Sequence, residues 1–225
     1  MVEKRDFDRV ADSWDEQPRR VRLAADVASA IMAAVELRPE MDVLDFGCGT
    51  GLLTLRLQPF VRSITGLDTS RGMLEVLQRK VEREGLANVR LFLNDPDGRP
   101  PAGPYHLIVS SMTFHHVPEI PPLLSALYSI TAPGGLLCIA DLDSEGGAFH
   151  DNPEGVFHHG FERDEICEAL RRAGYAEART VDAAEVVKPS ADGGVRRFKI
   201  FLAVGRKNDG KASAPAQRTR HHGLP

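Results

Sequence analysis

Three glycines alternate with small side chains in the segment Gly47-Cys48-Gly49-Thr50-Gly51, which directly follows a short apolar run. Because a glycine has no Cβ, a glycine turn between a strand and a helix lets backbone N–H groups approach a ligand closely. The segment therefore predicts a cofactor-binding loop to which all five residues contribute. A glycine triplet alone is a weak signal, because a turn can need glycine for packing reasons only.

The glycine spacing does not fit a dinucleotide-binding loop. Nicotinamide and flavin dehydrogenases use G-x-G-x-x-G, whose third glycine would stand at Leu52, whereas the third glycine here is Gly51. This mismatch argues against pyrophosphate binding and makes a dehydrogenase the third choice of function.

Acidic and amide side chains stand near the expected carboxyl ends of three successive strands. Asp45 lies within the first strand, Asp68 ends the second, and Asn94 and Asp95 follow the third. Open parallel sheets bind ligands at this edge. A carboxylate can accept hydrogen bonds from both ribose hydroxyls, and a residue after the third strand can accept one from an adenine amine. The pattern predicts an adenosine that carries a cation, and S-adenosylmethionine fits this description.

The elements that must position these residues alternate between strand and helix. Hydrophobic periodicity predicts helices around 6–13 and over 17–37, 70–84, 119–131 and 162–173. Strands are expected over 41–46, 61–67, 89–93, 105–110 and 135–141, with a final pair near 177–187 and 196–204. Such a chain forms an α/β fold, in which a parallel sheet carries helices on both faces and an antiparallel pair closes it.

Five segments together resemble the class I S-adenosylmethionine-dependent methyltransferases, in the small-molecule branch akin to the quinone-biosynthesis enzymes. They are VLDFGCGTG (43–51), ITGLDTS with Gly72-Met73-Leu74 (64–74), LFLNDPD (91–97), LIVSSMTFHHV (107–117) and APGGLLCIADLD (132–143), and the resemblance covers about residues 5–205. It implies a doubly wound, Rossmann-like sheet of seven strands, in the order 3-2-1-4-5-7-6 with strand 7 antiparallel. We expect N-terminal cap helices over 1–37, the methyltransferase domain over 38–206 and a polar, disordered tail over 207–225.

The resemblance also implies which side chains hold the cofactor, with S-adenosylhomocysteine as the product. Asp68 would bind the ribose, Met73 would pack on the adenine, Asp95 would bind the adenine amine, and Ser110 or Ser111 would meet the amino-acid end. The segment 7–16 resembles the family's cap and would bring Phe7, Trp14 and Arg19 or Arg20 near the cofactor. The full set expected at the cofactor is Asp45, Gly47, Cys48, Gly49, Thr50, Gly51, Asp68, Thr69, Met73, Asn94, Asp95, Ser110, Ser111, Trp14 and Arg19.

Five of the eight histidines lie in two segments that this architecture places over the cofactor's methyl group. Methyl transfer needs alignment and, where the acceptor must lose a proton, a base. We predict His150, His158 and His159 as catalytic candidates and, more weakly, His115 and His116, for which a structural hydrogen bond in their turn is the alternative. Imidazole and carboxylate suit divalent ions, so a metal held by His150, Asp151, His158 and His159 is a second alternative, although we predict no bound metal.

Composition limits the cellular setting and the partners. The chain has 42% hydrophobic and 27% charged residues, its beginning is charged, and it has no long apolar run, so we expect a cytoplasmic protein without a membrane span. Its three cysteines show no CxxC spacing, which argues against a disulfide framework or a cysteine-rich zinc module.

The distribution of charge favours a small acceptor. The net charge is −4, and 206–225 contains five basic residues and one acidic residue, so the rest of the chain carries −8 and is poorly suited to a nucleic-acid backbone. We therefore expect methyl transfer to a small molecule. The alternatives are an RNA or protein methyltransferase and a catalytically inactive S-adenosylmethionine-binding regulatory protein. The sequence does not predict the acceptor or the oligomeric state.

Overall fold

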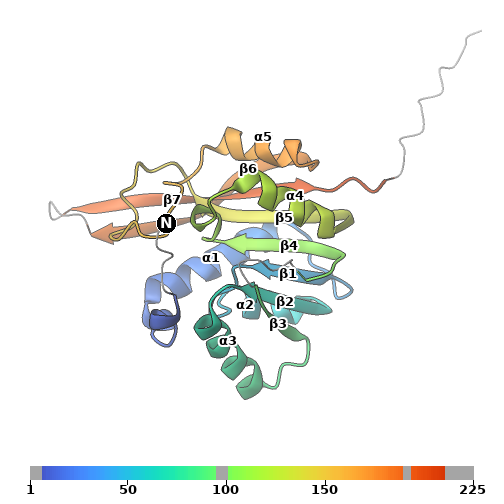
Figure 1. Ribbon diagram of the computed structural model, residues 1–225, viewed down its shortest axis with the longest axis horizontal. Helices are drawn as coiled ribbons and strands as arrows, with labels where there is room; N and C mark the ends of the chain where they lie inside the picture. Colours follow the sequence, from blue (N-terminus) through green and yellow to red (C-terminus); the bar gives the residue numbers. More distant parts are fainter. Residues whose placement is uncertain (1–6, 95–100, 190–193, 211–225) are drawn as a thin grey trace, which may run out of the picture.

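The computed structural model describes residues 7–94, 101–189 and 194–210, and its strands form one seven-stranded sheet (Figure 1). The sheet order is β3-β2-β1-β4-β5-β7-β6, in which β7 runs antiparallel to both of its neighbours and the other pairs are parallel. The predicted fold class and strand order are therefore confirmed. The strands are β1 (Asp42–Phe46), β2 (Ser63–Asp68), β3 (Val89–Leu93), β4 (Tyr105–Ser111), β5 (Thr131–Leu142), β6 (Ala176–Pro189) and β7 (Val195–Arg206).

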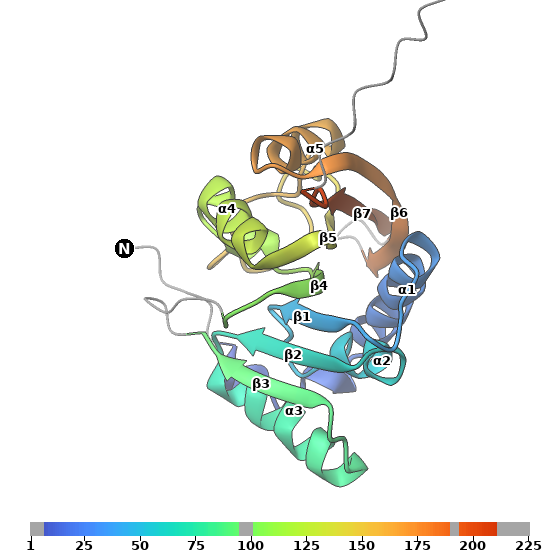
Figure 2. The same ribbon diagram turned by 90° about the vertical axis from the view of Figure 1, so that its right-hand side faces the viewer.

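Helices cover both faces of the sheet (Figure 2). Helices α1, α2 and α3 pack on one face, while α4 and α5 pack on the other. The helices are α1 (Pro18–Ala34), α2 (Thr54–Leu57), α3 (Arg71–Glu84), α4 (Ile120–Ile130) and α5 (Arg163–Arg172). Short 3₁₀ turns are η1 (Asp8–Val10), η2 (Trp14–Glu16), η3 (Gln58–Phe60) and η4 (Phe114–His116).

Two hydrophobic cores hold the layers together. In β1, Val43 faces the core that includes Ile31 of α1 and Leu77 of α3, whereas Leu44 faces the core that includes Leu124 of α4. Successive strand residues point to opposite faces, so a strand that is buried on both faces reads as a continuous apolar run. This is why the central strands are recognisable in the sequence.

Helix α3 has clear sequence signals at both ends. The Ser70 hydroxyl accepts a hydrogen bond from the Met73 N–H at the N-terminus, and Gly85 ends the helix in the left-handed conformation with φ 64°. These are the capping residues that helices prefer. The observed helix, Arg71–Glu84, differs from the predicted one by a single residue.

The predicted helix at 6–13 is wrong, because the described part of this segment forms only the short 3₁₀ turn η1, which a second such turn, η2, follows. The carboxylate of Asp8 accepts hydrogen bonds from the Ser70 hydroxyl and the Gly72 N–H at the start of α3. The segment is therefore held against the start of α3, by partners that are remote in the sequence. Residue 6 lies outside the described residues.

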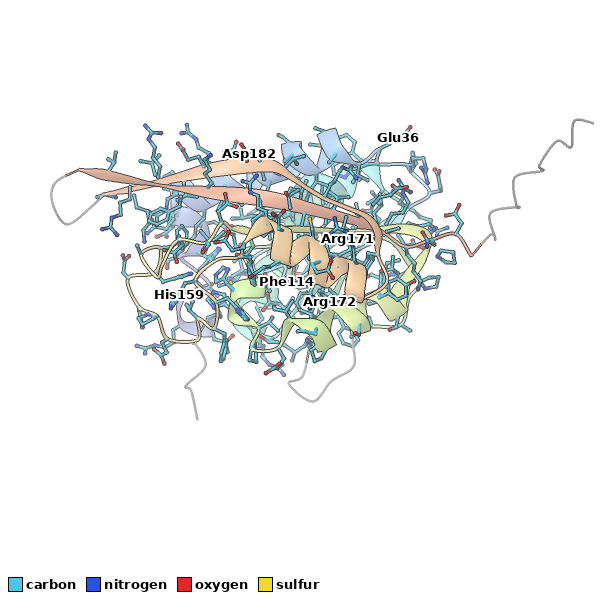
Figure 3. The ribbon with its side chains drawn as sticks, turned by 90° about the horizontal axis from the view of Figure 1, so that it is seen from above. Glu36, Phe114, His159, Arg171, Arg172 and Asp182 are labelled. Atoms are coloured by element: carbon cyan, nitrogen blue, oxygen red, sulfur yellow. The ribbon has the colours of Figure 1, made fainter. Side chains whose placement is uncertain are left out.

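The final hairpin is longer than predicted and projects from the edge of the sheet (Figures 1 and 3). The start of the expected tail is anchored, because Lys207 Nζ donates to the carbonyl oxygens of Tyr128 and Thr131 at 2.7 and 2.8 Å. The rest of that expected tail, from 211 onward, lies outside the described residues. In the part of the chain that the structure describes, no helix has the length and apolar character needed to cross a membrane.

Candidate cofactor and acceptor site

The glycine loop after β1 is tied to the end of β2. The N–H groups of Gly47 and Cys48 both donate to the Leu67 carbonyl, at 2.8 and 3.0 Å. The Asp68 carboxylate accepts hydrogen bonds from the Gly49 N–H at 2.7 Å and from the Ser70 N–H at 2.9 Å. The loop and the acid at the second strand end thus meet at one edge of the sheet, as the strand-end pattern predicts.

The three glycines of the loop have different surroundings. A Cβ on Gly47 would lie 2.2 Å from Thr113 Oγ1, and one on Gly51 would lie 2.3 Å from Leu77 Cδ1. A Cβ on Gly49 would meet no atom within 4 Å. Gly47 and Gly51 are therefore needed for packing, whereas Gly49 faces open space beside the Asp68 carboxylate.

Asp45 lies behind the loop and has only 1% of its surface exposed. Burial, opposed by the hydrogen bond from Thr54 and assisted by the nearby charge of Asp68, raises the pKa of Asp45 to about 7. That bond runs from Thr54 Oγ1 to Asp45 Oδ2 at 2.6 Å. A cation placed over the loop would favour the ionised form of this carboxyl group.

Thr50 fastens the N-terminal segment to the glycine loop. Its hydroxyl donates to Asp15 Oδ1 of η2 at 2.6 Å, and Lys80 Nζ of α3 donates to its carbonyl at 2.6 Å. Lys80 also forms an ion pair with Asp15. The side chain of Thr50 therefore binds the N-terminal segment through Asp15.

The cap residues gather beside the turn after β4. The edge of the Phe7 ring contacts both Trp14 and His116, at ring-centroid distances of 5.9 and 5.3 Å. The Arg20 guanidinium lies 3.6 Å from the centroid of the Trp14 ring and donates to the Trp14 carbonyl. Arg19 is exposed, so Arg20 is the arginine that holds Trp14.

The other side chains expected at the cofactor have varied environments. Met73 is buried in a small cluster with Ala11 and Val76, against which Trp14 packs. Asn94 Oδ1 is buried and has no hydrogen-bond partner among the described residues. Ser110 is buried and donates to the Phe46 carbonyl, Ser111 is half-buried, Thr69 is exposed, and burial raises the pKa of the Cys48 thiol. Asp95 lies outside the described residues.

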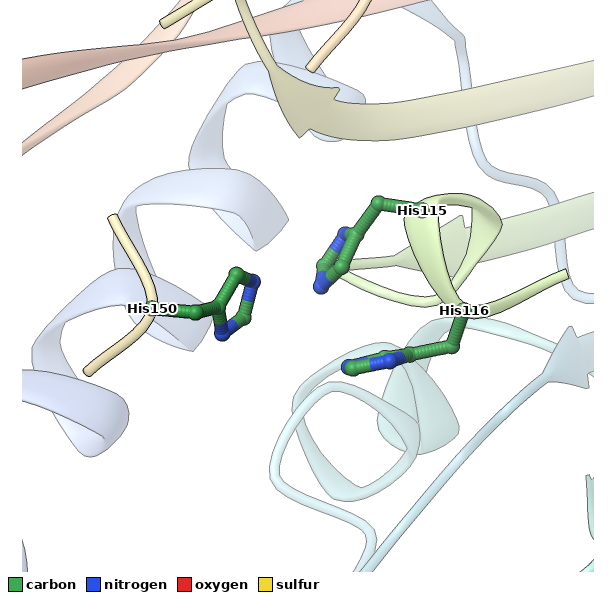
Figure 4. A group of neighbouring side chains, drawn as sticks. All are labelled: His115, His116 and His150. Atoms are coloured by element: carbon green, nitrogen blue, oxygen red, sulfur yellow. The ribbon is translucent and has the colours of Figure 1, made fainter. Parts of the chain in front are cut away.

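Three histidines from two segments converge at this edge (Figure 4). His115 Nδ1 lies 2.7 Å from Asp141 Oδ1, and both side chains are buried. His116 Nδ1 lies 2.7 Å from the Gly155 carbonyl oxygen. The His150 ring centroid is 4.9 Å from that of His115 and 5.6 Å from that of His116.

The other two candidate histidines lie apart from this group. His158 Nε2 is bonded to the Val117 carbonyl at 2.9 Å, and His159 is exposed on the outer side of the loop (Figure 3). Asp151 forms an ion pair with Lys188. His150 is thus grouped with His115 and His116, and not with the partners of the metal alternative weighed from sequence.

Sequence reasoning missed Asp141, Asp15 and Lys80. Asp141 ends a predicted strand in the same way as Asp68, so the strand-end pattern contains a signal for it. Asp15 and Lys80 carry no such signal, because their pairing joins residues far apart in the chain. Met112, just after β4, adopts φ 56°, a left-handed backbone conformation that is costly for a non-glycine residue.

Comparison with known proteins establishes the family. The model of the methyltransferase domain family matches residues 17–179. The chain belongs to the class I S-adenosylmethionine-dependent methyltransferases. An uncharacterised methyltransferase of Schizosaccharomyces pombe is 32% identical over 161 residues, which are 64% of this chain and 57% of the relative. A demethylmenaquinone methyltransferase of Thermus thermophilus is 29% identical over 157 residues, 67% of each chain.

The fold is shared with solved structures at low sequence identity. A putative methyltransferase of Haloferax volcanii, solved in complex with the Trm112 methyltransferase activator, has a TM-score of 0.71 and 20% identity, covering 91% of this chain and 99% of that chain. Among the curated relatives, the match spans about half of the length of several, from 47% to 57% in the first three.

The described residues of this methyltransferase fit S-adenosylmethionine, the cofactor of the family. Gly49 leaves open space where a Cβ would stand, the Asp68 carboxylate lies beside it, and the buried Asn94 Oδ1 lacks a partner among the described residues. Asp45 lies behind this space as a carboxyl group that a cation would ionise. These oxygen acceptors therefore suit an adenosine whose hydroxyl and amine groups donate hydrogen bonds and which carries a positive charge.

The glycine environments give a testable contrast. We expect Gly49→Ala to weaken S-adenosylhomocysteine binding and to cost only about 1–2 kcal/mol of stability, because the new methyl group enters ligand space and the left-handed backbone is strained. Gly47→Ala should cost more stability, because its Cβ would overlap Thr113 as well. Calorimetric titration and urea unfolding of both variants measure the two effects. Equal loss of stability in the two variants would contradict this assignment.

Proposed function

We propose that this methyltransferase transfers the methyl group of S-adenosylmethionine to a small-molecule acceptor. The observation that carries the proposal is that two segments cover the acceptor edge. The N-terminal segment reaches it through Phe7, and the loop after β5 reaches it through the bond from His116 to the Gly155 carbonyl and through the Phe157 N–H, which donates to the His115 carbonyl. An edge covered on both sides favours a small acceptor over a polymer and excludes water from the reaction.

The bound cofactor would supply a methyl carbon already activated by a sulfonium. The role of the chain is then to align the acceptor with that carbon. Asp68 would hold the ribose and Asn94 would accept from a cofactor donor. We propose His115, one of the two weaker candidates from the sequence, as the group that takes a proton from an acceptor, because Asp141 accepts at its Nδ1 and thereby orients the ring. The catalytic roles of His116, His150, His158 and His159 stay predictions.

Ligand binding tests the cofactor assignment first. We expect micromolar binding of S-adenosylmethionine and S-adenosylhomocysteine and no binding of NADH, because the loop lacks a glycine at Leu52. Calorimetric titration of the purified protein with each ligand decides this. Binding of NADH alone would mean that the glycine loop is a dinucleotide site and would overturn the proposal.

An acceptor screen tests the small-molecule assignment. Release of S-adenosylhomocysteine is followed with a low-molecular-weight metabolite fraction and, separately, with RNA and protein fractions. Turnover with the small-molecule fraction alone supports the proposal. Turnover only with RNA or protein would show a macromolecule methyltransferase, and cofactor binding without turnover on any fraction would favour the inactive regulatory protein.

A further inference from the structure

We propose that His115, His116 and His150 form a binding site for a divalent transition-metal ion, for which Zn²⁺ is the best match. One ring nitrogen from each of the three lies within 4.8 Å of the other two. They come from two separate segments, the η4 turn after β4 and the loop after β5, and their rings meet in Figure 4. This set differs from the one that sequence spacing suggests, since it excludes His158 and His159.

The hydrogen bonds of two of these rings prepare them as ligands. The Asp141 carboxylate also accepts hydrogen bonds from the backbone N–H groups of His115 and Leu142, so both of its oxygens face N–H donors. A carboxylate accepts hydrogen bonds, so we assign the donor role in this contact to His115 Nδ1. His116 Nδ1 donates in the same way, because the Gly155 carbonyl can only accept.

A neutral imidazole that donates at Nδ1 has its lone pair on Nε2. Metal-bound histidines commonly show this arrangement, in which an outer carboxylate or carbonyl fixes the ring and raises its basicity. His115 with Asp141 and His116 with Gly155 both match it. The proposed site is therefore supported by the hydrogen bonds that orient two of the rings, in addition to the closeness of the three rings.

The ligand chemistry and the geometry select the ion. Imidazole ligands suit zinc, copper, iron and nickel, and three histidines with one open position are a known arrangement for zinc. Bonds of about 2.0–2.1 Å in a tetrahedron place the nitrogens roughly 3.3–3.4 Å apart, so the group must contract on binding. His150 lies on the irregular loop after β5 and can supply that movement.

The same loop carries a carboxyl group, that of Glu145, which is bonded to the residue before His150. Its Oε2 accepts a hydrogen bond from the Phe149 N–H at 2.7 Å. Its other oxygen, Oε1, is buried and has no hydrogen-bond partner in the described part of the chain. Burial of a carboxylate oxygen without a hydrogen-bond partner costs free energy, and a nearby cation reduces that cost.

The role of the ion rests on the proposed function, whereas its binding does not. The η4 turn follows Thr113, whose hydroxyl lies 3.4 Å from the Gly47 carbonyl, so the turn that carries His115 and His116 begins beside the glycine loop. An ion there would lower the pKa of an acceptor hydroxyl. With the ion bound, His115 Nε2 would be a ligand and not the base, so the hydroxyl would lose its proton to bulk water as the acceptor enters. Its oxygen would then bond to the methyl carbon, and the bond from carbon to sulfur would break with both electrons left on sulfur.

Metal titration of the untagged full-length protein tests the site. After treatment with a chelator, the protein should bind one Zn²⁺ per chain, and Co²⁺ should give visible absorption bands of a four-coordinate ion. His116→Ala and His150→Ala should each weaken Zn²⁺ binding by more than the roughly 10- to 100-fold that loss of an outer partner costs, and Asp141→Asn should weaken it within that range.

Matched variants control this titration. His159→Ala removes an exposed histidine from the same loop, and the double change His221→Ala, His222→Ala removes the histidine pair near the end of the sequence, so both should bind Zn²⁺ as the parent protein does. Thermal unfolding without metal should be the same for His150→Ala and the parent protein. Absence of one-to-one binding, or its loss in the control variants instead, would overturn the site.

Two outcomes separate this inference from the proposed function. If the protein transfers methyl groups but binds no Zn²⁺ or Co²⁺, the metal site is wrong and the proposed function stands. If it binds Zn²⁺ but turns over equally fast after metal removal, the site stands and its role in deprotonating the acceptor is wrong. Loss of turnover on metal removal with S-adenosylhomocysteine binding unchanged supports both the site and its role.

Discussion

Asp68→Ala should weaken S-adenosylhomocysteine binding by more than about tenfold, which corresponds to on the order of 1.5–3 kcal/mol for a lost hydrogen bond to a charged group. The carboxylate stands at the end of β2 and is oriented by the N–H groups of Gly49 and Ser70. Alanine removes the acceptor for the ribose hydroxyls and also leaves these two N–H groups without their partner. Calorimetric titration gives the change in affinity directly.

A second aspartate provides the matched control. Asp42 lies at the opposite, amino end of β1, where it is bonded to Arg62 and Ser63. Asp42→Ala removes a carboxylate from the same sheet without touching the cofactor edge, so its S-adenosylhomocysteine affinity should equal that of the parent protein. An unchanged affinity in Asp68→Ala would remove Asp68 from the site. An equal loss in both variants would point to a general effect on folding.

The elements of the sheet are predictable because their signals are local. Central strands such as β1 are buried on both faces and appear as apolar runs, and Ser70 and Gly85 mark the ends of α3. The strand order is a different matter. Periodicity predicts a parallel sheet, but the order that the structure confirms came from the family resemblance, because the pairing of strands depends on contacts between distant segments.

The N-terminal segment shows where local reasoning fails. Its apolar and polar residues are compatible with a helix, yet Asp8 bonds to the start of α3 and Asp15 bonds to Thr50 and Lys80. Each interaction joins residues that are far apart in the sequence. The conformation of the segment is therefore set by tertiary partners, which outweigh helix propensity.

The histidines illustrate the same limit within the candidate site. Sequence position placed all five near the acceptor, but the path of the loop after β5 decides which of them meet. That loop is fixed by backbone bonds, from Phe157 to His115 and from Phe161 to Leu142, for which an irregular segment gives no sequence signal. The sequence therefore predicts the region in which the histidines lie, but not which of them come together.

Asp45→Asn should remove a cost that the folded, cofactor-free protein carries at high pH. Burial and the charge of Asp68 raise the pKa of Asp45 from 3.8 to about 7, with the Thr54 hydroxyl opposing them. Between these two values the folded state holds a proton that the unfolded state has released. The contribution of Asp45 to stability is therefore most favourable below pH 4, falls as the pH rises toward 7, and levels off above it.

The size of this effect follows from the shift. A difference of one in pKa corresponds to about 1.4 kcal/mol, so from pH 5 to pH 8 the free energy of unfolding of the parent protein should fall by roughly 2–3 kcal/mol through Asp45. Asparagine keeps an oxygen that can accept from Thr54 Oγ1 and does not titrate in this range, so Asp45→Asn should gain that amount relative to the parent protein over the same interval. Urea unfolding at the two pH values measures it.

The control for this titration is again Asp42, because its surroundings act in the opposite direction. The Arg62 and Ser63 hydrogen bonds lower the pKa of Asp42 to about 2 against the cost of its burial. Its contribution to stability is therefore present above pH 4 and is lost only as the pH falls toward 2, so Asp42→Asn should leave the change between pH 5 and pH 8 as it is in the parent protein. If Asp45→Asn also left that change unaltered, Asp45 would be ionised throughout in the folded protein. The charged form would then be present without any ligand, and a bound cation would not be needed to produce it.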